Sequence, residues 1–539
     1  MNTMHEQGTQ DGPAARAPAS LRVRFGEPLL LLVSLALSVL GAIIGMQLIV
    51  TLGISANTSV IGALIAIVFS RIPIEVARRF RVLERQNLVQ TAISSATFGA
   101  GNSLMIPLGV PYAVGMPELS LPMMIGALAA MLVDGAMLYF LFGTRTFPAT
   151  GSWPSGVATA EAIWAGDQGG RKAAFLGLGV LVGVAGSWLG VPMSAFGAAF
   201  LGNIAALTMF GIGLLVRGYS VAVTGIDIAK AYIPHGIMIG AGTVAMIQVG
   251  SEIYRARQAS GAQVQMAAQA SSAGRAGRIL AGGYVIYALI ALLITGLAGG
   301  FTHMSLGMAI AFVLYAAFAA YVHELIVGIA AMHSGWFPAF AVALITLTIG
   351  ILIGFPPTAL AVLAGFSAAT GPAFADMGYD LKTGFLLRGE GRDPELELAG
   401  RRQQFIAAMA GFVVAGVVVL LFSKGFFARD MLPPVDRVYA ASIKAGSSWE
   451  ITRSLALWAI PGALLQWLGG AKRQLGVLLA TGLLLTSPLA GFAVLAGLLL
   501  RLVLRRMRGK EPPELSAFAG GVIAGDALFT FGRSLIKIK

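Results

Sequence analysis

The sequence predicts an all-α polytopic integral membrane protein. Of its 539 residues, 57% are hydrophobic and only 11% are charged, a balance far from that of a soluble globular domain. Apolar runs of the length that crosses a bilayer as a helix recur along the whole chain. We therefore expect about 14–16 transmembrane helices, several of them broken or re-entrant. Residues 27–539 are expected to form a single transmembrane domain.

The apolar runs give the expected spans in order. The first run, 27–51, is too long for the core of a signal peptide, so it is expected to stay in the protein. The expected spans are 27–51, 56–74, 86–107, 121–142, 173–190, 192–214, 235–254, 279–299, 304–321, 337–354, 357–372, 404–423, 453–470, 474–487 and 489–503. Shorter pieces at 152–166, 219–232, 322–334 and 515–531 complete the count, depending on which of them turn back.

The positive charges predict how the chain is oriented, because Lys and Arg in short loops favour the cytoplasmic side. Arg22 and Arg24 precede the first span, whereas the loop 107–120 carries no positive charge. We expect a protein of the cell inner (cytoplasmic) membrane with a cytoplasmic N-terminus. The predicted connections are a cytoplasmic tail at 1–26, cytoplasmic loops near 255–278 and 380–403, and an external loop near 424–450.

The stretch SWPSGVATAEA, residues 152–162, is predicted to be a broken or re-entrant segment. Arg145 and Arg171 flank it and both favour the cytoplasm, so a single complete crossing between them is excluded. Non-helical backbone at membrane depth persists only when it is buried in protein or lines a wet cavity. The same reasoning applies to 219–232 and 515–531.

A helix that begins inside the membrane can bind a substrate carboxylate. Pro154 suits the first turn of a helix, and Ser152 is placed to cap it. The N-terminus of such a half-helix offers free N–H groups and partial positive charge. Helix packing is the alternative for this face, because small residues let helices approach closely. The candidate substrate-binding residues are Ser155, Gly156 and Thr159.

Two carboxylates inside apolar segments are candidates for proton coupling. Asp134 lies near the middle of the run 121–142, where a charge costs about 2.5–3.5 kcal/mol on insertion scales. Glu161 lies inside the segment 152–166. Each is expected to face water, a partner or a proton path. For Asp134 the alternative is an ion pair with a basic residue of another helix, such as Lys230.

The segment 84–103 is rich in uncharged hydrogen-bonding groups. Such side chains either bond neighbouring helices together or line a cavity that recognises amides and carboxylates. Gln90, Thr91 and Asn102 are therefore candidate substrate-binding residues. His235 is a further candidate, although a lone histidine at the edge of an apolar run is more often a packing residue.

Absent motifs exclude several classes of protein. The chain has no cysteine, which excludes a disulfide framework, a thiolate zinc site and an iron–sulfur cluster. The sequence HELIV at His323 has Val327 where a zinc protease needs its second histidine, and no GxxxxGK[ST] loop binds nucleotide phosphates. No metal, cofactor or enzymatic activity is expected. The net charge of +13 lies in short loops that face lipid, so no nucleic-acid partner is expected.

Four stretches resemble the oligopeptide transporter family, which includes the Yellow Stripe-like metal-chelate transporters. ERQNLVQTAISSA, 84–96, is similar to the family's acidic–Asn–Gln–Thr opening. PSGVATAEAI, 154–163, resembles its Pro-Ser-Gly-Thr-Ala-Thr-Ala segment. DMGYDLKTGFLLRG, 376–389, resembles the Asp-Phe-Lys-Thr-Gly-Tyr-Leu stretch of the Yellow Stripe-like branch. GGVIAGDALF, 520–529, resembles the closing Gly-Leu-Ile-Cys-Gly-Asp segment.

The resemblance implies a gradient-driven, proton-coupled importer of small oligopeptides or of metal complexes with amino-acid-derived chelators. Its partners would be that substrate, protons and the lipid bilayer, and a homodimer is left open. Val157 and Ala524 depart from the family pattern, which leaves open whether these positions touch substrate. The family motif expected on the cytoplasmic side, which favours the chelate branch, comprises Asp380, Lys382, Thr383 and Gly384.

Two other functional classes stay open. A polytopic membrane enzyme, such as an intramembrane hydrolase or a lipid-modifying transferase, would need a nucleophile and a base that the spacing does not pair. A passive channel would differ from a carrier because it gives no uptake against a gradient.

Overall fold

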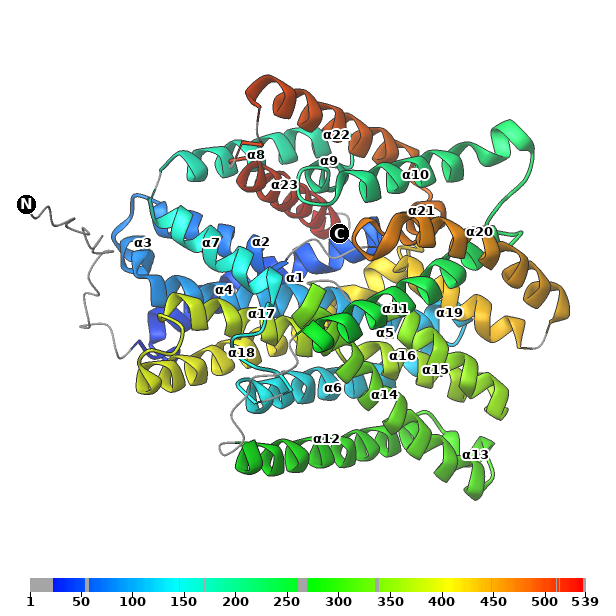
Figure 1. Ribbon diagram of the computed structural model, residues 1–539. Coiled ribbons are helices and arrows are strands. Elements are labelled where there is room, and N and C mark those ends of the chain that lie inside the picture. Colours follow the sequence, from blue (N-terminus) through cyan, green and yellow to red (C-terminus); the bar gives the residue numbers. More distant parts are fainter. Residues whose placement is uncertain are drawn as a thin grey trace, which may run out of the picture.

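The chain is built from helices throughout the residues that the structure describes (Figure 1). The computed structural model describes residues 23–53, 58–144, 146–168, 170–259, 269–334, 339–446, 448–509, 511–512 and 514–536. Within these residues, the one strand-like pairing is an isolated bridge between Phe142 and Phe147. The predicted all-α fold is confirmed. Of the predicted tail and first cytoplasmic loop, residues 1–22 and 260–268 lie outside the described residues.

Eight helical stretches in the described part of the chain are long and apolar enough to cross a bilayer. They are α1 (Pro28–Leu52), η3 (Pro117–Leu119) with α6 (Ser120–Leu141), α10 (Ile204–Thr224), α12 (Gln269–Leu297), α14 (Leu306–Ser334), α16 (Pro357–Ala369) with α17 (Pro372–Leu387), α18 (Pro394–Phe427) and α22 (Pro488–Arg508). Shorter apolar stretches lie in α2 (Thr58–Arg71), α8 (Gly170–Trp188), α11 (Ile233–Ala259), α15 (Ala339–Ile353), α21 (Leu475–Leu484) and α23 (Leu515–Ile536). The chain is thus a multi-pass membrane protein, and the number of its crossings stays a prediction.

The remaining helices are short or rich in polar residues. They are α3 (Glu75–Arg78), η1 (Arg79–Arg81), α4 (Leu83–Phe98), the π-helix η2 (Gly99–Met105), α5 (Ile106–Val114), α7 (Pro154–Gln168), α9 (Met193–Ala198), α13 (Gly300–His303), α19 (Pro434–Ala445) and α20 (Trp449–Arg473). α4, η2 and α5 follow one another without a break, so the predicted span 86–107 is the middle of a longer helical segment. π-Turns inside such segments are frequently found at functional sites.

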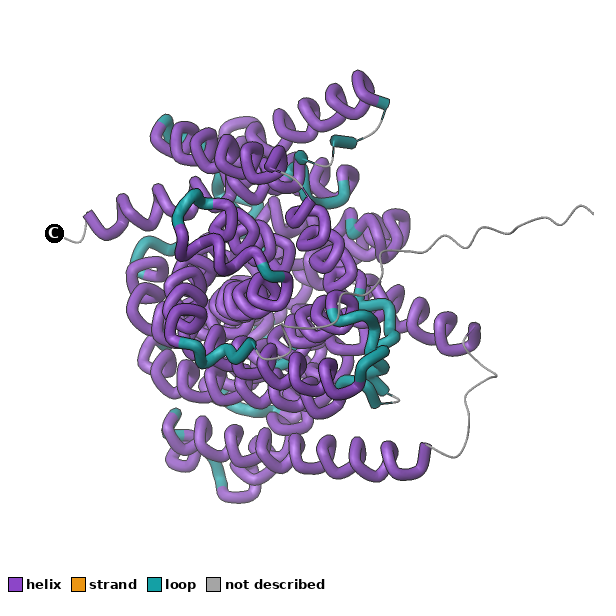
Figure 2. The backbone as a smooth tube through the Cα atoms, turned by 90° about the vertical axis from the view of Figure 1, so that its left-hand side faces the viewer, coloured by secondary structure: helices purple, strands orange, loops and turns teal. Residues whose placement is uncertain are grey.

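α4 and α17 lie at the centre of the bundle. α4 packs against α1, α2, α17 and α18, and α17 also packs against α6, α7 and α14. In Figure 1, α12 and α13 form one edge, while α8, α9, α10 and α22 form the opposite edge. Figure 2 shows the bundle turned by 90°, with helices at its centre surrounded by other helices. From Pro372 to Phe385 every residue of α17 is buried, although the helix carries two aspartates and a lysine.

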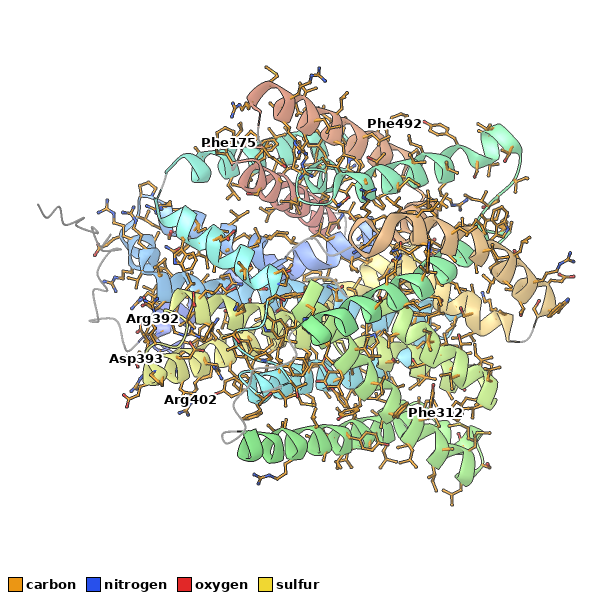
Figure 3. All side chains as sticks on the ribbon, viewed as in Figure 1. Phe175, Phe312, Arg392, Asp393, Arg402 and Phe492 are labelled. Carbon is orange, nitrogen blue, oxygen red and sulfur yellow. The ribbon has the colours of Figure 1, made fainter. Side chains whose placement is uncertain are left out.

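The starts of α1 and α18 lie at one end of the bundle, which we call the near end. There the N–H group of Phe25 donates to Gln403 Oε1 at 2.9 Å. Arg392, Asp393 and Arg402 also gather at this end (Figure 3). The far end holds the last residues of α1 and the connection 428–433 that follows α18. The positive-charge pattern predicts that the near end is cytoplasmic.

Two helix pairs contact each other through glycines. α8 pairs with α23, where a Cβ on Gly183 would lie 2.3 Å from the carbonyl oxygen of Val522. α11 pairs with α20, where a Cβ on Gly240 would lie 1.8 Å from the carbonyl oxygen of Ala459. A side chain does not fit at these distances. Small residues therefore bring the backbones into direct contact, as they commonly do in membrane helices.

Two of the predicted loops are wrong in extent. Most of 380–403 is helical, because α17 continues to Leu387 and α18 begins at Pro394. Asp393 caps α18 by accepting from the N–H group of Glu395 at 3.0 Å. The region 424–450 contains the largely buried helix α19. Charged residues suggested loops in both places, but several of these charges are buried against other helices.

Other predicted boundaries also differ. The region 192–214 is not one span but α9, a turn and the start of α10. The region 219–232 does not re-enter: α10 continues to Thr224, and a salt bridge of 2.7 Å between Arg217 and Asp227 spans the following turn. The piece 322–334 belongs to α14, and 515–531 belongs to the continuous helix α23.

Candidate functional site

Two carboxylates one helical turn apart are buried at the centre of the bundle. Asp376 and Asp380 lie on α17 and are fully buried. Residues four apart share a helix face, and this face meets α4. Ser94 Oγ donates to Asp376 Oδ1, and Gln90 Nε2 donates to Asp380 Oδ1, both at 2.7 Å. Asp376 Oδ2 has no hydrogen-bond partner among the described residues, which leaves a buried acceptor free.

Gln404 of α18 extends these contacts into a network. Its Nε2 donates to the carbonyl oxygen of Asp380 at 2.7 Å and to Thr91 Oγ1 at 3.2 Å. Its Oε1 accepts from Arg388 Nη1 at 2.8 Å. Within the described part of the chain, neither Asp376 nor Asp380 forms a salt bridge. We call the following residues the polar core cluster: Gln90, Thr91, Ser94, Ser95, Asp376, Asp380 and Gln404.

Gly384 makes the space that this network needs. A Cβ on Gly384 would lie 2.0 Å from Gln404 Oε1 and 2.4 Å from Arg388 Nη1. Gly400 of α18 has a similar role, since a Cβ there would lie 2.7 Å from Arg388 Nε. The glycine of the motif expected from the sequence therefore lets Gln404 reach Asp380.

α7 packs on α17 through Gly156, which is the contact expected from the helix-packing alternative for this face. A Cβ on Gly156 would lie 2.5 Å from the carbonyl oxygen of Tyr379, so the two backbones touch. Thr383 Oγ1 donates to the carbonyl oxygen of Gly156 at 3.0 Å. Lys382 Nζ donates to the carbonyl oxygen of Ala149 at 3.0 Å, just before α7. Ser155 and Thr159 lie on the same helix, joined by a bond of 2.8 Å from Thr159 Oγ1 to the Ser155 carbonyl oxygen.

The segment formed by α16 and α17 is broken between Thr370 and Gly371. Gly371 has a φ of 94°, and a Cβ there would lie 2.9 Å from the Cβ of Val327, so glycine is required. Asp134 of α6 accepts a hydrogen bond from the Gly371 N–H group. His323 Nδ1 contacts the carbonyl oxygen of Thr370. Both sides of this one peptide group are thus bonded to ionisable side chains.

A second group of buried ionisable residues surrounds this break. Tyr287 donates its hydroxyl hydrogen to Asp134 Oδ1. Glu324 is fully buried within electrostatic range of the same tyrosine, and its carboxylate oxygens have no partner of good hydrogen-bond geometry among the described residues. His323 Nε2 also contacts the carbonyl oxygen of Ala339 at 2.7 Å, so both ring nitrogens face acceptors. We call Asp134, Tyr287, His323 and Glu324 the break cluster.

Three residues singled out in the sequence lie away from the polar core cluster. Asn102 lies in η2, beyond the end of α4. His235 is buried near the start of α11, which packs on α20 rather than on α4. Glu161 is exposed, because Ala160 and Ile163 belong to the buried face of α7. Hydropathy and spacing do not reveal which helices become neighbours, so the sequence alone does not show that these residues lie apart from the cluster.

Several residues of the two clusters are not among the candidate site residues predicted from the sequence, and Asp376, Glu324, Gln404 and Tyr287 are the most informative of them. Asp376 carries a detectable signal, because it precedes Asp380 by one helical turn and so places a second carboxylate on the same helix face. Glu324 follows His323 inside an apolar run and carries a weaker signal of the same kind. Gln404 and Tyr287 give no signal in the sequence, since their roles depend on contacts between distant helices.

Two pockets lie at opposite ends of the bundle. The near-end pocket, of about 490 Å³, is lined in part by Asn87, whose Oδ1 accepts from Gln404 Nε2 at 3.3 Å. The far-end pocket, of about 500 Å³, is lined in part by the end of α1 and by Asp526. Asp526 accepts a bond of 2.7 Å from the N–H group of Ser194, at the start of α9. The polar core cluster is thus adjacent to the near-end pocket. Helices α1 and α18 run from the near end of the bundle to the far-end pocket.

Among the described residues, no three His, Asp or Glu side chains are arranged to hold a metal ion.

Comparison with known protein families identifies a family that covers most of the chain. The family described as OPT oligopeptide transporter protein matches residues 29–251 and 219–537. These ranges include all four stretches that resemble the family in the sequence. No curated protein and no solved structure matches the chain.

Proposed function

Because this chain belongs to the oligopeptide transporter family, we propose that it is a secondary active, proton-coupled importer of small amino-acid-derived molecules. The cargo class comprises short oligopeptides and metal complexes of amino-acid-derived chelators. The observation that carries the proposal is the polar core cluster, in which two buried carboxylates have no salt bridge among the described residues. Its membrane is the cytoplasmic membrane, with the near end inside.

The ammonium group of a substrate is the cation that fits beside these carboxylates. A buried carboxylate costs several kcal/mol unless it is neutralised or paired. Asp376 Oδ2 has a free acceptor position toward which an ammonium can donate. Gln90 and Thr91 supply the amide and hydroxyl groups that suit the backbone of a peptide or the carboxylates of a chelator. Ser155, Gly156 and Thr159 support the site from α7.

The break cluster is the proposed site of proton coupling. Asp134 bonds the N–H group of Gly371, at the start of the helix that carries both substrate-binding carboxylates. Protonation of Asp134 removes the negative charge that favours this contact with a helix N-terminus. The joint between α16 and α17 then loosens, and α17 can move relative to α4. Glu324 and His323 are the neighbouring groups that exchange protons with Asp134.

The far-end pocket gives the cargo a route to one side of the polar core cluster. In one state the cluster opens toward the far-end pocket, and in the other toward the near end of the bundle. In many transporters broken helices form the substrate site, and alternating access comes from the rocking of one part of the bundle against another around that site.

Charge movement in proteoliposomes tests the proposal. Under an inward proton gradient, current is measured with a pool of short peptides and separately with iron or nickel chelates. Current with one class alone identifies the cargo. Silence with both, or current that persists when the proton gradient is removed by an ionophore, would contradict proton-coupled uptake of this class.

A second measurement separates a carrier from a passive channel. Accumulation of labelled cargo above its external concentration is expected when the proton gradient is imposed, and it should collapse when the gradient collapses. Equilibration without accumulation would instead support a channel.

A further inference from the structure

We propose that the near-end pocket binds the headgroup of an anionic phospholipid. The pocket lies between the residues before α1, the start of α4, the end of α17 and the start of α18. Its lining includes three arginines, Arg24, Arg388 and Arg402, together with leucine and isoleucine side chains. Positive charge beside an apolar wall suits a ligand that is both anionic and apolar, such as a phospholipid.

Arg388 is the anchor of the proposed site. Its side chain is only 6% exposed, and it donates from Nε to Glu397 Oε2 and from Nη1 to Gln404 Oε1, both at 2.8 Å. Its Nη2 has no partner among the described residues. Buried donors are nearly always hydrogen-bonded, so a missing acceptor is expected here. A phosphate oxygen is such an acceptor, and the planar guanidinium matches phosphate geometry.

The charge around the pocket favours an anion. Arg24 and Arg402 are exposed at the rim, and Glu84 is the one acidic residue of the lining. Glu397, outside the lining, is shared between Arg388 and Arg401. The lining thus carries a surplus of positive charge at the end of the helices. Basic pockets between membrane helices at this depth bind anionic headgroups.

An exposed apolar stripe leads away from the pocket along α18. It begins at Ile406, a pocket residue that is 42% exposed. It continues along one side of the helix, at helical spacing, through Val413, Val417, Leu420 and Leu421, each more than half exposed. A lipid whose phosphate occupies the pocket can lay an acyl chain on this stripe. A free anion has no use for it, and for this reason the phospholipid is the favoured occupant.

Bound lipid would also steady the polar core cluster, because Arg388 bonds Gln404, which in turn bonds Asp380.

Native mass spectrometry of the full chain in detergent tests the site. Phosphatidylglycerol and phosphatidylcholine with the same acyl chains are titrated in parallel. We expect phosphatidylglycerol to bind more tightly, with about a fivefold loss for each pocket arginine removed. The single variant Arg402→Gln should show this fivefold loss. The double variant with Arg388→Gln and Arg402→Gln should lose most of the preference for phosphatidylglycerol over phosphatidylcholine. The matched control is Arg392→Gln, which removes an exposed arginine of the same end that does not line the pocket.

Two competition experiments test whether the bound anion is a phospholipid, free phosphate or the cargo. Excess inorganic phosphate and an excess of a dipeptide are each added to the complex with phosphatidylglycerol. We expect neither to displace the lipid, and displacement by either would overturn the proposal. Equal binding of the two lipids, or an equal loss in Arg392→Gln and Arg402→Gln, would overturn it as well. Because Arg402 is exposed, its variant decides the question even if the Arg388 variant does not fold.

Discussion

Asp134 and His323 bind opposite sides of one peptide group, the one that joins Thr370 to Gly371. The N–H side bonds to the carboxylate from α6, and the carbonyl side contacts the imidazole from α14. At this break the helices cannot satisfy the peptide themselves, and at membrane depth no bulk water replaces the missing partners. Two ionisable side chains take that role, so their protonation and the geometry of the break are linked.

Asp134→Asn is expected to uncouple uptake from protons. The amide keeps the size of the side chain but cannot exchange a proton, so accumulation driven by a proton gradient should fall by about 5- to 150-fold, the usual range of coupling between sites. Exchange of labelled for unlabelled cargo without a gradient should persist. The control is Glu161→Gln, which neutralises an exposed carboxylate on α7. Equal accumulation by Asp134→Asn and the native chain would contradict the assignment.

Asp380→Asn is expected to weaken cargo binding. Loss of a charged hydrogen-bond partner costs about 1.5–3 kcal/mol, which corresponds to a rise in KM of roughly 10- to 150-fold. Asp393→Asn is the matched control, because Asn caps a helix as well as Asp does. The KM of each variant is obtained from uptake measured at a series of cargo concentrations. A KM shared by the two variants would remove Asp380 from the binding site.

Gly371→Ala is expected to destabilise the protein. Its φ of 94° is unfavourable for any residue with a Cβ, and such strain costs of order 1–3 kcal/mol. The new methyl group would also meet Val327. Gly307→Ala serves as the control, since a Cβ there meets nothing within 4 Å. Thermal unfolding in detergent should give a lower Tm for the first variant only, and an unchanged Tm would show that the break can relax.

Gly156→Ala is expected to push α7 away from α17. The added Cβ would lie 2.5 Å from the Tyr379 carbonyl oxygen, and overpacking of this kind costs about 1–3 kcal/mol. Uptake and Tm should both fall, whereas Gly177→Ala, where a Cβ meets nothing within 4 Å, should change neither. Normal uptake by Gly156→Ala would mean that α7 does not need its close contact with α17.

The sequence predicts the apolar helices well and the polar ones poorly. The expected spans 27–51 and 121–142 agree with α1 and α6 within a residue or two. α17 is missed, because it falls between the expected span 357–372 and the expected loop 380–403, where Asp376, Asp380 and Lys382 resemble surface residues when their burial is unknown. Hydropathy reflects the free energy of placing a segment in lipid. It does not describe α17, because α17 is surrounded by other helices and not by lipid.

The same limit applies to the candidate site. Asp134 and Gln90 are predicted because polar groups inside apolar runs are costly, and Asp380 is predicted from the resemblance to the family. The pairing of Gln90 with Asp380 spans 290 positions, and no local pattern encodes it. Gln404 and Tyr287 give no local signal, because their roles depend on contacts between helices far apart in the chain.

The pairing of α8 with α23 has a consequence for biogenesis. Ser187 at the end of α8 bonds to Asp526 of α23, 339 positions later in the chain. At about 5–20 residues per second, the ribosome needs roughly 15–70 s to supply that partner. During this interval α8 is in the membrane without α23. Its glycine face must then be covered by lipid, by another nascent helix or by a membrane chaperone. Slow or paused synthesis of the last helix would lengthen this exposure and favour early degradation.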